Sequence, residues 1–291
     1  MGKNFKFSFL ILHYQTIEDT IECVESIFNN IEYDNYNIVI VDNGSPNKSG
    51  IELKQKYKNN KKIMVLINEK NLGFAKGNNI GFKYIKNNEN SDFIVMINND
   101  TIIKQKDFLN KVISVYKNER FHVLGPKIIS LVDNKNQNPQ NVLYKNKSDV
   151  IKAIKKFKIL YFLNLILLDN FIRLVYKNFL KKSLNKEKKF LGEKKDQKLH
   201  GSCLIFSKDY IEKYDGLYDK TFMYAEEDIL YFITKRDNLK MIYNPEIVIY
   251  HKEDSATNSI LKKDYLKRRF IYKNHIKSLK ELLKLMEEAE K

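Results

Sequence analysis

Apolar segments typical of strands alternate with amphipathic segments typical of helices through residues 1–118, and this alternation restricts the fold most. Short β-rich apolar runs of the kind found in buried strands occur at residues 6–14, 36–45, 62–71 and 92–101. Segments with helical character follow them, at residues 16–30, 50–58, 71–88 and 107–118. Thr16 and Asp19 predict a side-chain cap at the start of the first helix. Strands and helices joined by short connections predict a parallel sheet covered on both faces, and therefore an α/β fold.

The second half of the sequence shows the pattern less regularly. Residues 133–150 are polar and asparagine-rich and are expected to form a loop. Strands are expected at residues 201–207 and from residue 241, with a helix from about Glu227 between them. Near the C-terminus, apolar residues recur at helical spacing among charged ones, which predicts a packing helix with a charged outer face.

The chain is strongly basic, with a formal net charge of +16, and its 43% hydrophobic residues are typical of a globular protein. Such a charge favours an anionic partner: nucleic acid, an acidic membrane surface or a phosphorylated ligand. The sequence has no helix-turn-helix, RNP or zinc-ligand pattern, and its lysines are scattered rather than interleaved with stacking aromatics. We therefore expect no nucleic-acid partner.

Cysteine usage and the N-terminal residues bear on the compartment. Cys23 and Cys203 have no metal-type spacing and are expected to be reduced core thiols, as in a cytosolic protein. Residues 1–14 are basic and then apolar, but a secretion signal needs a longer apolar region and a small-residue cleavage site. We interpret this segment as the first strand.

Residues 151–184 mix lysines with dense apolar residues. The apolar run is interrupted by Asn164, Asp169 and Arg173, which makes it a poor membrane-spanning helix. Two interpretations stay open. The segment is either a basic amphipathic helix that lies on an anionic membrane, or an ordinary helical hairpin packed over the core.

Polar side chains stand where the expected strands end. They are Asp42 with Asn43, Asn71, and Asn98 with Asn99 and Asp100. Ligands bind at the carboxyl ends of strands in sheets of this kind, so we expect these residues along one rim. A carboxylate at Asp42 can accept hydrogen bonds from a base or a ribose, although "DNGS" is also good turn chemistry.

The loop "NLGFAKGNNIGF" has glycines at four-residue spacing, at Gly73, Gly77 and Gly81. Glycine lets backbone approach a ligand closely, and the start of a helix offers N–H groups to phosphate. Lys76 can add a phosphate contact. For Gly81, close packing of a helix is the simpler interpretation.

Three consecutive acids, Glu226, Glu227 and Asp228, follow an aromatic stretch at residues 222–224. Like charges at this spacing repel and need compensation wherever they are buried. A helix N-terminus favours acids through its dipole. A carboxylate can also serve as the general base that activates a hydroxyl nucleophile.

Six segments, in this order, resemble family 2 glycosyltransferases of the rhamnosyltransferase-like kind found in bacterial surface-polysaccharide synthesis. They are "ILHYQTIEDTIECVESI", "IVIVDNGS", "NEKNLGFAKGNNIGF", "VMINNDTII", "GSCLIFSKDYIEKYDGLYDKTFMYAEEDIL" and "IYHKEDSAT". The resemblance covers roughly residues 6–255. It implies a GT-A fold: a Rossmann-like mixed, mostly parallel sheet flanked by helices, with a helical insert and a C-terminal helix.

The resemblance also implies an activity, namely inverting transfer of a sugar from a UDP- or dTDP-linked donor to a hydroxyl of a lipid-linked or polysaccharide acceptor. It places the donor nucleotide at the rim and the glycine loop, on Asp42, Asn43, Asn71, Gly73, Lys76, Asn98 and Asn99. A divalent cation, Mn²⁺ or Mg²⁺, is expected at Asp100 and His251. Asn98 stands where the family usually has the first acid of its Asp-X-Asp element.

The same resemblance assigns the acids. An ungapped alignment puts Glu227 at the catalytic base, and a shift of one residue selects Asp228 instead. Glu226 then holds a neighbour or touches the acceptor. The aromatic stretch forms a shelf against which a sugar face packs.

The expected organisation follows. Residues 1–130 form the nucleotide-sugar-binding half, 131–195 the loop and basic insert, 196–260 the acceptor-binding and catalytic half, and 261–291 the C-terminal helices. The expected location is cytoplasmic, peripheral on the inner face of the plasma membrane. The alternative function is a basic nucleic-acid- or membrane-binding protein without catalysis.

Overall fold

The computed structural model describes residues 4–168, 194–195, 197–253 and 263–290. The strands are β1 (Phe7–His13), β2 (Tyr36–Asp42), β3 (Ile63–Ile67), β4 (Phe93–Asn98), β5 (Thr101–Ile102), β6 (Val123–Ser130), β7 (Lys194–Lys195), β8 (Cys203–Ser207) and β9 (Met241–His251). The helices are α1 (Ile17–Asn30), α2 (Ser49–Tyr57), α3 (Phe74–Asn88), α4 (Phe108–Glu119), α5 (Lys147–Leu165), α7 (Lys208–Ile211), α8 (Glu226–Arg236) and α10 (Asp264–Glu288).

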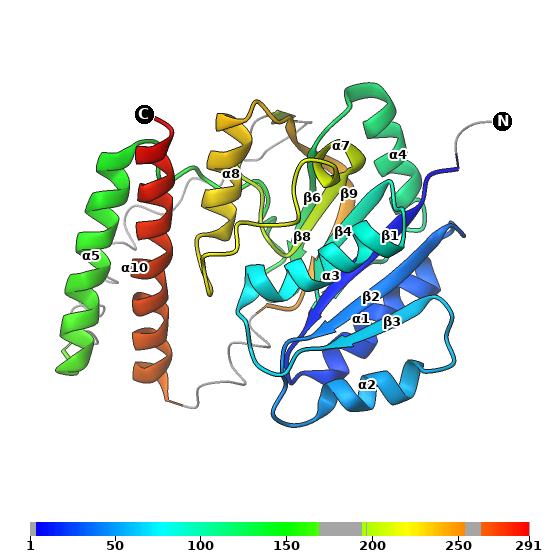
Figure 1. The fold of residues 1–291 in the computed structure, drawn as a ribbon, viewed down its shortest axis with the longest axis horizontal. Coiled ribbons are helices and arrows are strands. Elements are labelled where there is room, and N and C mark those ends of the chain that lie inside the picture. Colours follow the sequence, from blue (N-terminus) through cyan, green and yellow to red (C-terminus); the bar gives the residue numbers. More distant parts are fainter. Residues whose placement is uncertain (1–3, 169–193, 196, 254–262, 291) are drawn as a thin grey trace.

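Within the described residues the strands form one mixed sheet in the order β3-β2-β1-β4-β8-β6-β9-β5, and β7 pairs with β9 (Figure 1). The pairs β1–β2, β1–β4, β2–β3 and β6–β9 are parallel. β8 runs antiparallel to both β4 and β6, so it joins the N-terminal strands to the later ones. The mixed, mostly parallel sheet that the sequence predicts is confirmed.

Sequence reasoning did not predict β6. Gly125 and Pro126 interrupt its apolar run, and both residue types are usually read as strand breakers. The structure accommodates them at an irregularity, because the register with β9 shifts between Pro126 and Lys127. β6 therefore lies between β8 and β9 in spite of its sequence.

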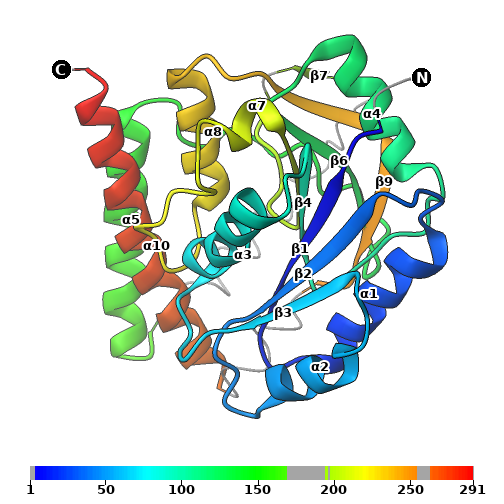
Figure 2. The ribbon, with the colours of Figure 1, turned by 45° about the vertical axis from the view of Figure 1, so that its right-hand side comes forward.

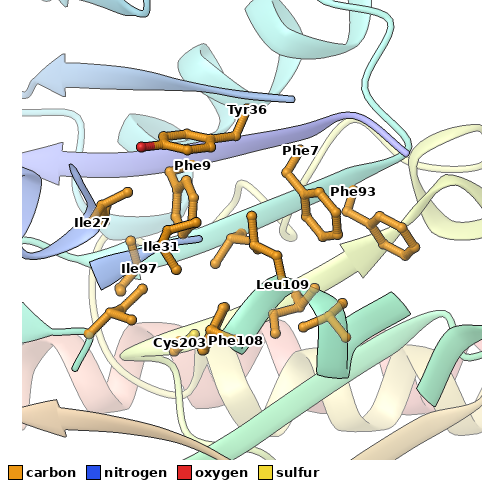
Figure 3. Close-up of a cluster of buried hydrophobic side chains, with 14 of the residues drawn as sticks. Phe7, Phe9, Ile27, Ile31, Tyr36, Phe93, Ile97, Phe108, Leu109 and Cys203 are labelled. Carbon is orange, nitrogen blue, oxygen red and sulfur yellow. The ribbon is translucent and has the colours of Figure 1, made fainter. Parts of the chain in front are cut away.

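Helices cover both faces of the sheet (Figure 2). On one face, Phe7 and Phe9 of β1 pack with Ile27 of α1 and with Phe108 and Leu109 of α4 (Figure 3). On the other face, side chains of α3, α7 and α8 pack against alternate residues of the same strands. Because both faces of β1 are buried, its sequence is continuously apolar from Phe9 to Leu12 rather than alternating with polar residues.

A third apolar cluster joins α5, α8 and α10, and it includes Val150, Ile229 and Leu279. α5 begins at Lys147, four residues inside the loop expected at 133–150, and Asn146 caps it by accepting from the Asp149 N–H. The part of the predicted 151–184 segment from residue 169 on lies outside the described residues. No helix in the described ranges is long and apolar enough to cross a bilayer.

Candidate active site

A cavity of about 260 Å³ lies at the carboxyl ends of β1 and β4. It is lined by nine of the residues that the sequence singles out: Asn43, Asn71, Gly73, Asn98, Asn99, Asp100, Glu226, Glu227 and His251. Three expected site residues, Asp42, Lys76 and Asp228, do not line it. The cavity therefore brings the expected nucleotide, metal and catalytic groups together.

Strand register explains how these distant residues meet. Leu12 of β1 pairs with Asn98 of β4, and His13 pairs with Asp42 of β2, so the polar strand ends form one rim. His251 reaches the rim because β9 pairs with β5, opposite Thr101.

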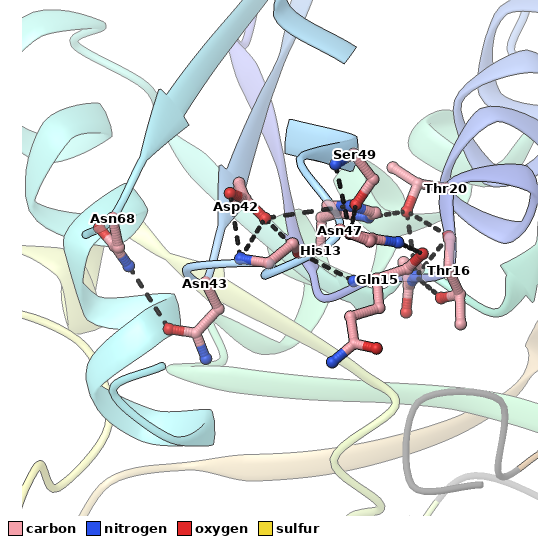
Figure 4. Close-up of polar contacts among 11 residues, drawn as sticks. His13, Gln15, Thr16, Thr20, Asp42, Asn43, Asn47, Ser49 and Asn68 are labelled. Atoms are coloured by element: carbon pink, nitrogen blue, oxygen red, sulfur yellow. Dashed lines mark hydrogen bonds and ion pairs between the residues drawn. The ribbon is translucent and has the colours of Figure 1, made fainter. Parts of the chain in front are cut away.

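Asp42 stands behind the rim in a turn. The residue is 3% exposed, and its carboxylate accepts hydrogen bonds from the Ser45 N–H and hydroxyl (Figure 4). Burial raises the pKa of Asp42. Gly50 leaves room for this carboxylate, because a Cβ there would stand 2.2 Å from it. These contacts fit the turn interpretation, and a contact between Asp42 and a nucleotide base stays a prediction.

Asn43 holds the glycine loop. Its side-chain carbonyl accepts from the Leu72 N–H at 3.0 Å, and its amide donates to Asn71 and to the Gly73 carbonyl, both at 3.1 Å. Gly73 has φ +83°, and a Cβ there would stand 2.1 Å from the Phe222 carbonyl oxygen. Only glycine fits this close approach of two backbone segments.

The other two glycine-loop predictions have different outcomes. A Cβ on Gly81 would stand 2.2 Å from Leu10 and 2.7 Å from Val41, so this glycine serves helix packing, as expected. Lys76 is exposed in the first turn of α3 and does not line the cavity. A phosphate contact from Lys76 stays a prediction.

Asn99 is fixed by a polar network beneath the rim. Its amide donates to the hydroxyls of Thr16 at 2.8 Å and Thr20 at 3.0 Å. Buried His13 links Thr20 to Ser49, with a 2.7 Å contact on each ring nitrogen (Figure 4). Thr16 is the N-cap residue of α1, as predicted, but its side chain makes no cap hydrogen bond, and its hydroxyl instead accepts from Asn99.

Asp100 and His251 stand side by side in the cavity. The His251 Nε2 lies 3.3 Å from the Asp100 Oδ1, and its Nδ1 lies 2.8 Å from the Gln137 Oε1. Because the Gln137 oxygen accepts, Nδ1 carries a proton, and in a neutral ring this leaves Nε2 as the nitrogen that can bind a cation. A carboxylate oxygen and an imidazole nitrogen suit a divalent cation, although the described residues contain no cluster of three or more such ligands.

The three consecutive acids have three different surroundings at the start of α8. Glu226 is buried and accepts from the Thr221 hydroxyl at 3.0 Å; burial and the neighbouring Glu227 raise its pKa to about 8. Glu227 faces the cavity and accepts from the Gly201 N–H at 3.2 Å. Asp228 turns away and pairs with Lys198 at 2.8 Å. The crowded charge is thus offset in three ways: a proton on Glu226, a backbone N–H donor to Glu227 and a buried ammonium beside Asp228. The dipole of α8 favours all three acids.

The cavity wall also contains residues that sequence reasoning missed, among them Tyr14 and His200. His200 accepts from the Ser202 N–H at 3.1 Å through Nδ1, so its Nε2 carries the proton. Burial, and secondarily His251, lower the pKa of His200 to about 4. One signal in the sequence points to His200: it directly precedes "GSC" of the segment that resembles the family, and Gly201 and Ser202 of that segment also line the cavity.

The expected aromatic shelf forms part of the wall through Met223 and Tyr224. Tyr224 has φ +72° and is backed by His275, with ring centroids 4.7 Å apart and planes at 16°. His275 is stacked in turn on Phe157 of α5, at 4.4 Å and 3°. Phe222 does not line the cavity, and its carbonyl accepts from the Phe74 N–H at 2.8 Å.

Comparison with solved structures establishes the type of fold. S. aureus TarS 1–349 superposes with a TM-score of 0.53 at 15% identity, over 85% of this chain and 60% of that one. The same fragment in complex with UDP gives a TM-score of 0.54 at 13% identity, over 92% of this chain and 65% of that one. The expected GT-A fold is confirmed by this likeness.

Sequence comparison establishes the family. The low-salt glycan biosynthesis hexosyltransferase Agl10 of Haloferax volcanii is 22% identical over 237 residues, which are 80% of this chain and 63% of that protein. This chain thus spans less than two thirds of the length of that relative. Residues 8–215 match the sequence profile described as glycosyl transferase family 2. With that match over most of its length, the chain belongs to glycosyl transferase family 2.

Proposed function

We propose that this chain transfers a sugar, with inversion, from a UDP- or dTDP-linked donor to a hydroxyl of a lipid-linked or polysaccharide acceptor. The product would enter capsule, O-antigen or another cell-surface glycan at the inner face of the plasma membrane. The observation that carries the proposal is the meeting of Glu227, Asp100 and His251 in one cavity. The names of the relatives support it, since one is a glycan biosynthesis hexosyltransferase and a TarS fragment binds UDP.

The donor side of the cavity suits a nucleoside diphosphate. Asn43 and Asn71 hold the glycine loop at the rim, and α3 begins there at Phe74, so the positive end of its dipole lies at the cavity. Asp100 and His251 would hold a divalent cation, Mn²⁺ or Mg²⁺. Such an ion neutralises the charge of a diphosphate leaving group.

The acceptor side supplies the base. Glu227 takes the proton of the acceptor hydroxyl while that oxygen bonds to the anomeric carbon. The bond from that carbon to the diphosphate oxygen breaks at the same time, and the nucleoside diphosphate leaves with the electron pair. The Gly201 N–H holds one oxygen of Glu227 in place, and Asp228 is the weaker candidate because Lys198 occupies it.

The test measures nucleotide release from a panel of UDP-, dTDP- and GDP-linked sugars. Each donor is assayed with Mn²⁺ or Mg²⁺ and again with EDTA, and nucleotide binding is followed by calorimetry. We expect slow hydrolysis of one UDP- or dTDP-linked donor that stops with EDTA and falls in Asp100→Asn. A chain that binds no nucleotide of the panel, with or without metal, contradicts the proposal.

A further inference from the structure

Helix α5 presents an apolar face that nothing in the described part of the chain covers. Ile159 is 60% exposed and Phe162 is 62% exposed, and Ile151 and Ile166 follow the same spacing along the helix. At 3.6 residues per turn these four side chains fall on one side of α5. Large apolar side chains grouped in this way mark a docking surface.

The opposite side of α5 is already used. Val150 and Ile154 pack into the cluster with Leu279 of α10, and Asn164 accepts from Arg269 Nε at 3.0 Å. Figure 1 shows α5 on the outer side of α10, away from the sheet. The hairpin-type packing and an outward apolar face therefore coexist on one helix, on opposite sides.

The charge around this face identifies its occupant. Lys152, Lys155, Lys156 and Lys158 are exposed, and residues 150–168 contain no acid. No acid in the described ranges pairs with these lysines. Lysines that flank an apolar stripe match a bilayer with anionic headgroups, where the ammonium groups meet phosphates and the apolar side chains enter the acyl boundary. A second copy of the chain would bring two such lysine sets together, which is unfavourable.

We infer that the outward face of α5 docks this protein on an anionic lipid bilayer. The face consists of Ile151, Lys155, Ile159, Phe162 and Ile166.

The docking face is rigidly connected to the cavity. Phe157, on the inner side of α5, stacks on His275, which stacks on Tyr224 of the cavity wall. The Ser278 hydroxyl of α10 donates to the Met223 carbonyl at 3.0 Å. Docking through α5 thus sets the acceptor side of the cavity at a fixed orientation to the membrane. A lipid-linked acceptor would reach the cavity from that membrane; this consequence rests on the proposed function, whereas the docking itself does not.

The experiment uses the full chain and sedimentation with two vesicle types, phosphatidylcholine alone and phosphatidylcholine mixed with phosphatidylglycerol. We expect binding to the mixed vesicles that weakens with salt, and much weaker binding to phosphatidylcholine. Ile159→Ser with Phe162→Ser should lower the binding at least tenfold, because two apolar side chains would no longer enter the acyl boundary. Lys155→Glu with Lys158→Glu should lower it by about fivefold or more per lysine.

Matched controls lie on the distant edge of the molecule. Ile51→Ser with Met64→Ser changes exposed apolar residues of α2 and β3, and Lys54→Glu with Lys58→Glu changes exposed charges of α2. The apolar control should bind like wild type, and the charge control should lose much less than the α5 pair. Equal losses in control and α5 pairs would overturn the inference, as would no wild-type binding. A wild-type dimer that the apolar α5 pair converts to monomer, with no vesicle binding, would assign the face to a second copy and also overturn it.

Nucleotide release without acceptor separates this inference from the proposed function. The α5 variants should release nucleotide at the wild-type rate, because the changed side chains do not line the cavity. Vesicle binding by a chain that neither binds nor releases any nucleotide of the panel would leave the docking face standing and the proposed function in error.

Discussion

The ammonium of Lys198 donates a 2.8 Å hydrogen bond to the carboxylate of Asp228, and both side chains are largely buried. Glu227, one residue earlier, accepts from the Gly201 N–H and faces the cavity. Two adjacent acids in the same helical turn therefore have different partners: Asp228 is neutralised by a buried ammonium, and Glu227 is left facing the cavity. This difference underlies the first two predictions.

We expect Glu227→Gln to lower sugar transfer by a factor of about 10² to 10⁴ while nucleotide binding is kept, because an amide takes no proton from the acceptor. Asp228→Asn should keep most of the transfer rate. Steady-state kinetics together with calorimetric binding of the nucleotide distinguish the two. Full transfer in Glu227→Gln with loss in a folded Asp228→Asn would move the base to Asp228.

Lys198→Met should destabilise the fold by about 3 kcal/mol or more, since it leaves a buried carboxylate without its cation. The double variant Lys198→Met with Asp228→Leu should recover most of this loss. Urea unfolding measures both. The control is Lys86→Met, whose partner Asp215 is exposed, and its effect should stay within about 1 kcal/mol. A Lys198→Met variant as stable as wild type would show that the pair contributes little.

Acid should destabilise the protein between about pH 6.5 and pH 4. Burial lowers the pKa of His13 and His275 to about 4, so the unfolded chain takes up protons in this range that the folded chain does not. Their contribution to stability is complete above pH 6.5 and is lost as the pH falls through the folded-state pKa. His275→Phe keeps the stack with Phe157 and Tyr224 and should flatten the curve of unfolding free energy against pH. An unchanged slope would exclude His275 as a source.

Glu226 should make the protein less stable as the pH rises, which is opposite to the effect of the two histidines. Its folded-state pKa of about 8 means that the folded chain holds a proton that the unfolded chain loses near pH 4.5. Stability from this group therefore falls as the pH rises from about 4.5 to about 8. Glu226→Gln should remove that fall, which urea midpoints from pH 5 to pH 9 would reveal. If the stability of the Glu226→Gln variant decreased with pH in the same way as wild type, Glu226 would be excluded as the cause of the decrease.

Much of the rim could be predicted because it depends on local patterns. Asn98, Asn99 and Asp100 follow an apolar strand directly, and parallel pairing carries the end of that strand to the end of β1. For such residues, knowing where a strand ends is enough to locate the side chain at the ligand-binding edge. Asn71 and Gly73 also line the cavity, but β3 ends at Ile67, and contacts with Asn43 place these two residues.

Other features of the site depend on contacts between segments far apart in the chain, and the sequence around each residue gives no indication of them. Lys198 meets Asp228, and Gln137 meets His251, only after the whole sheet is assembled. Asp42 stands at the predicted strand end, but its side chain turns into a local turn with Ser45. β6 escaped prediction because a bulge tolerates the Gly125–Pro126 interruption. Position along a strand can be inferred from sequence, whereas the direction of a side chain at its end cannot.

The placement of β8 has a consequence for synthesis of the chain. The first four strands of the sheet order form in sequence as the N-terminal half emerges, and β4 is then the edge. Its partner begins only at Cys203, so the apolar segment "FIVMIN" presents an unpaired strand edge until the ribosome has produced β8. An open apolar edge recruits other chains. This protein should thus be most prone to aggregate while it is still being made, and slowing translation between β4 and β8 should lower its soluble yield.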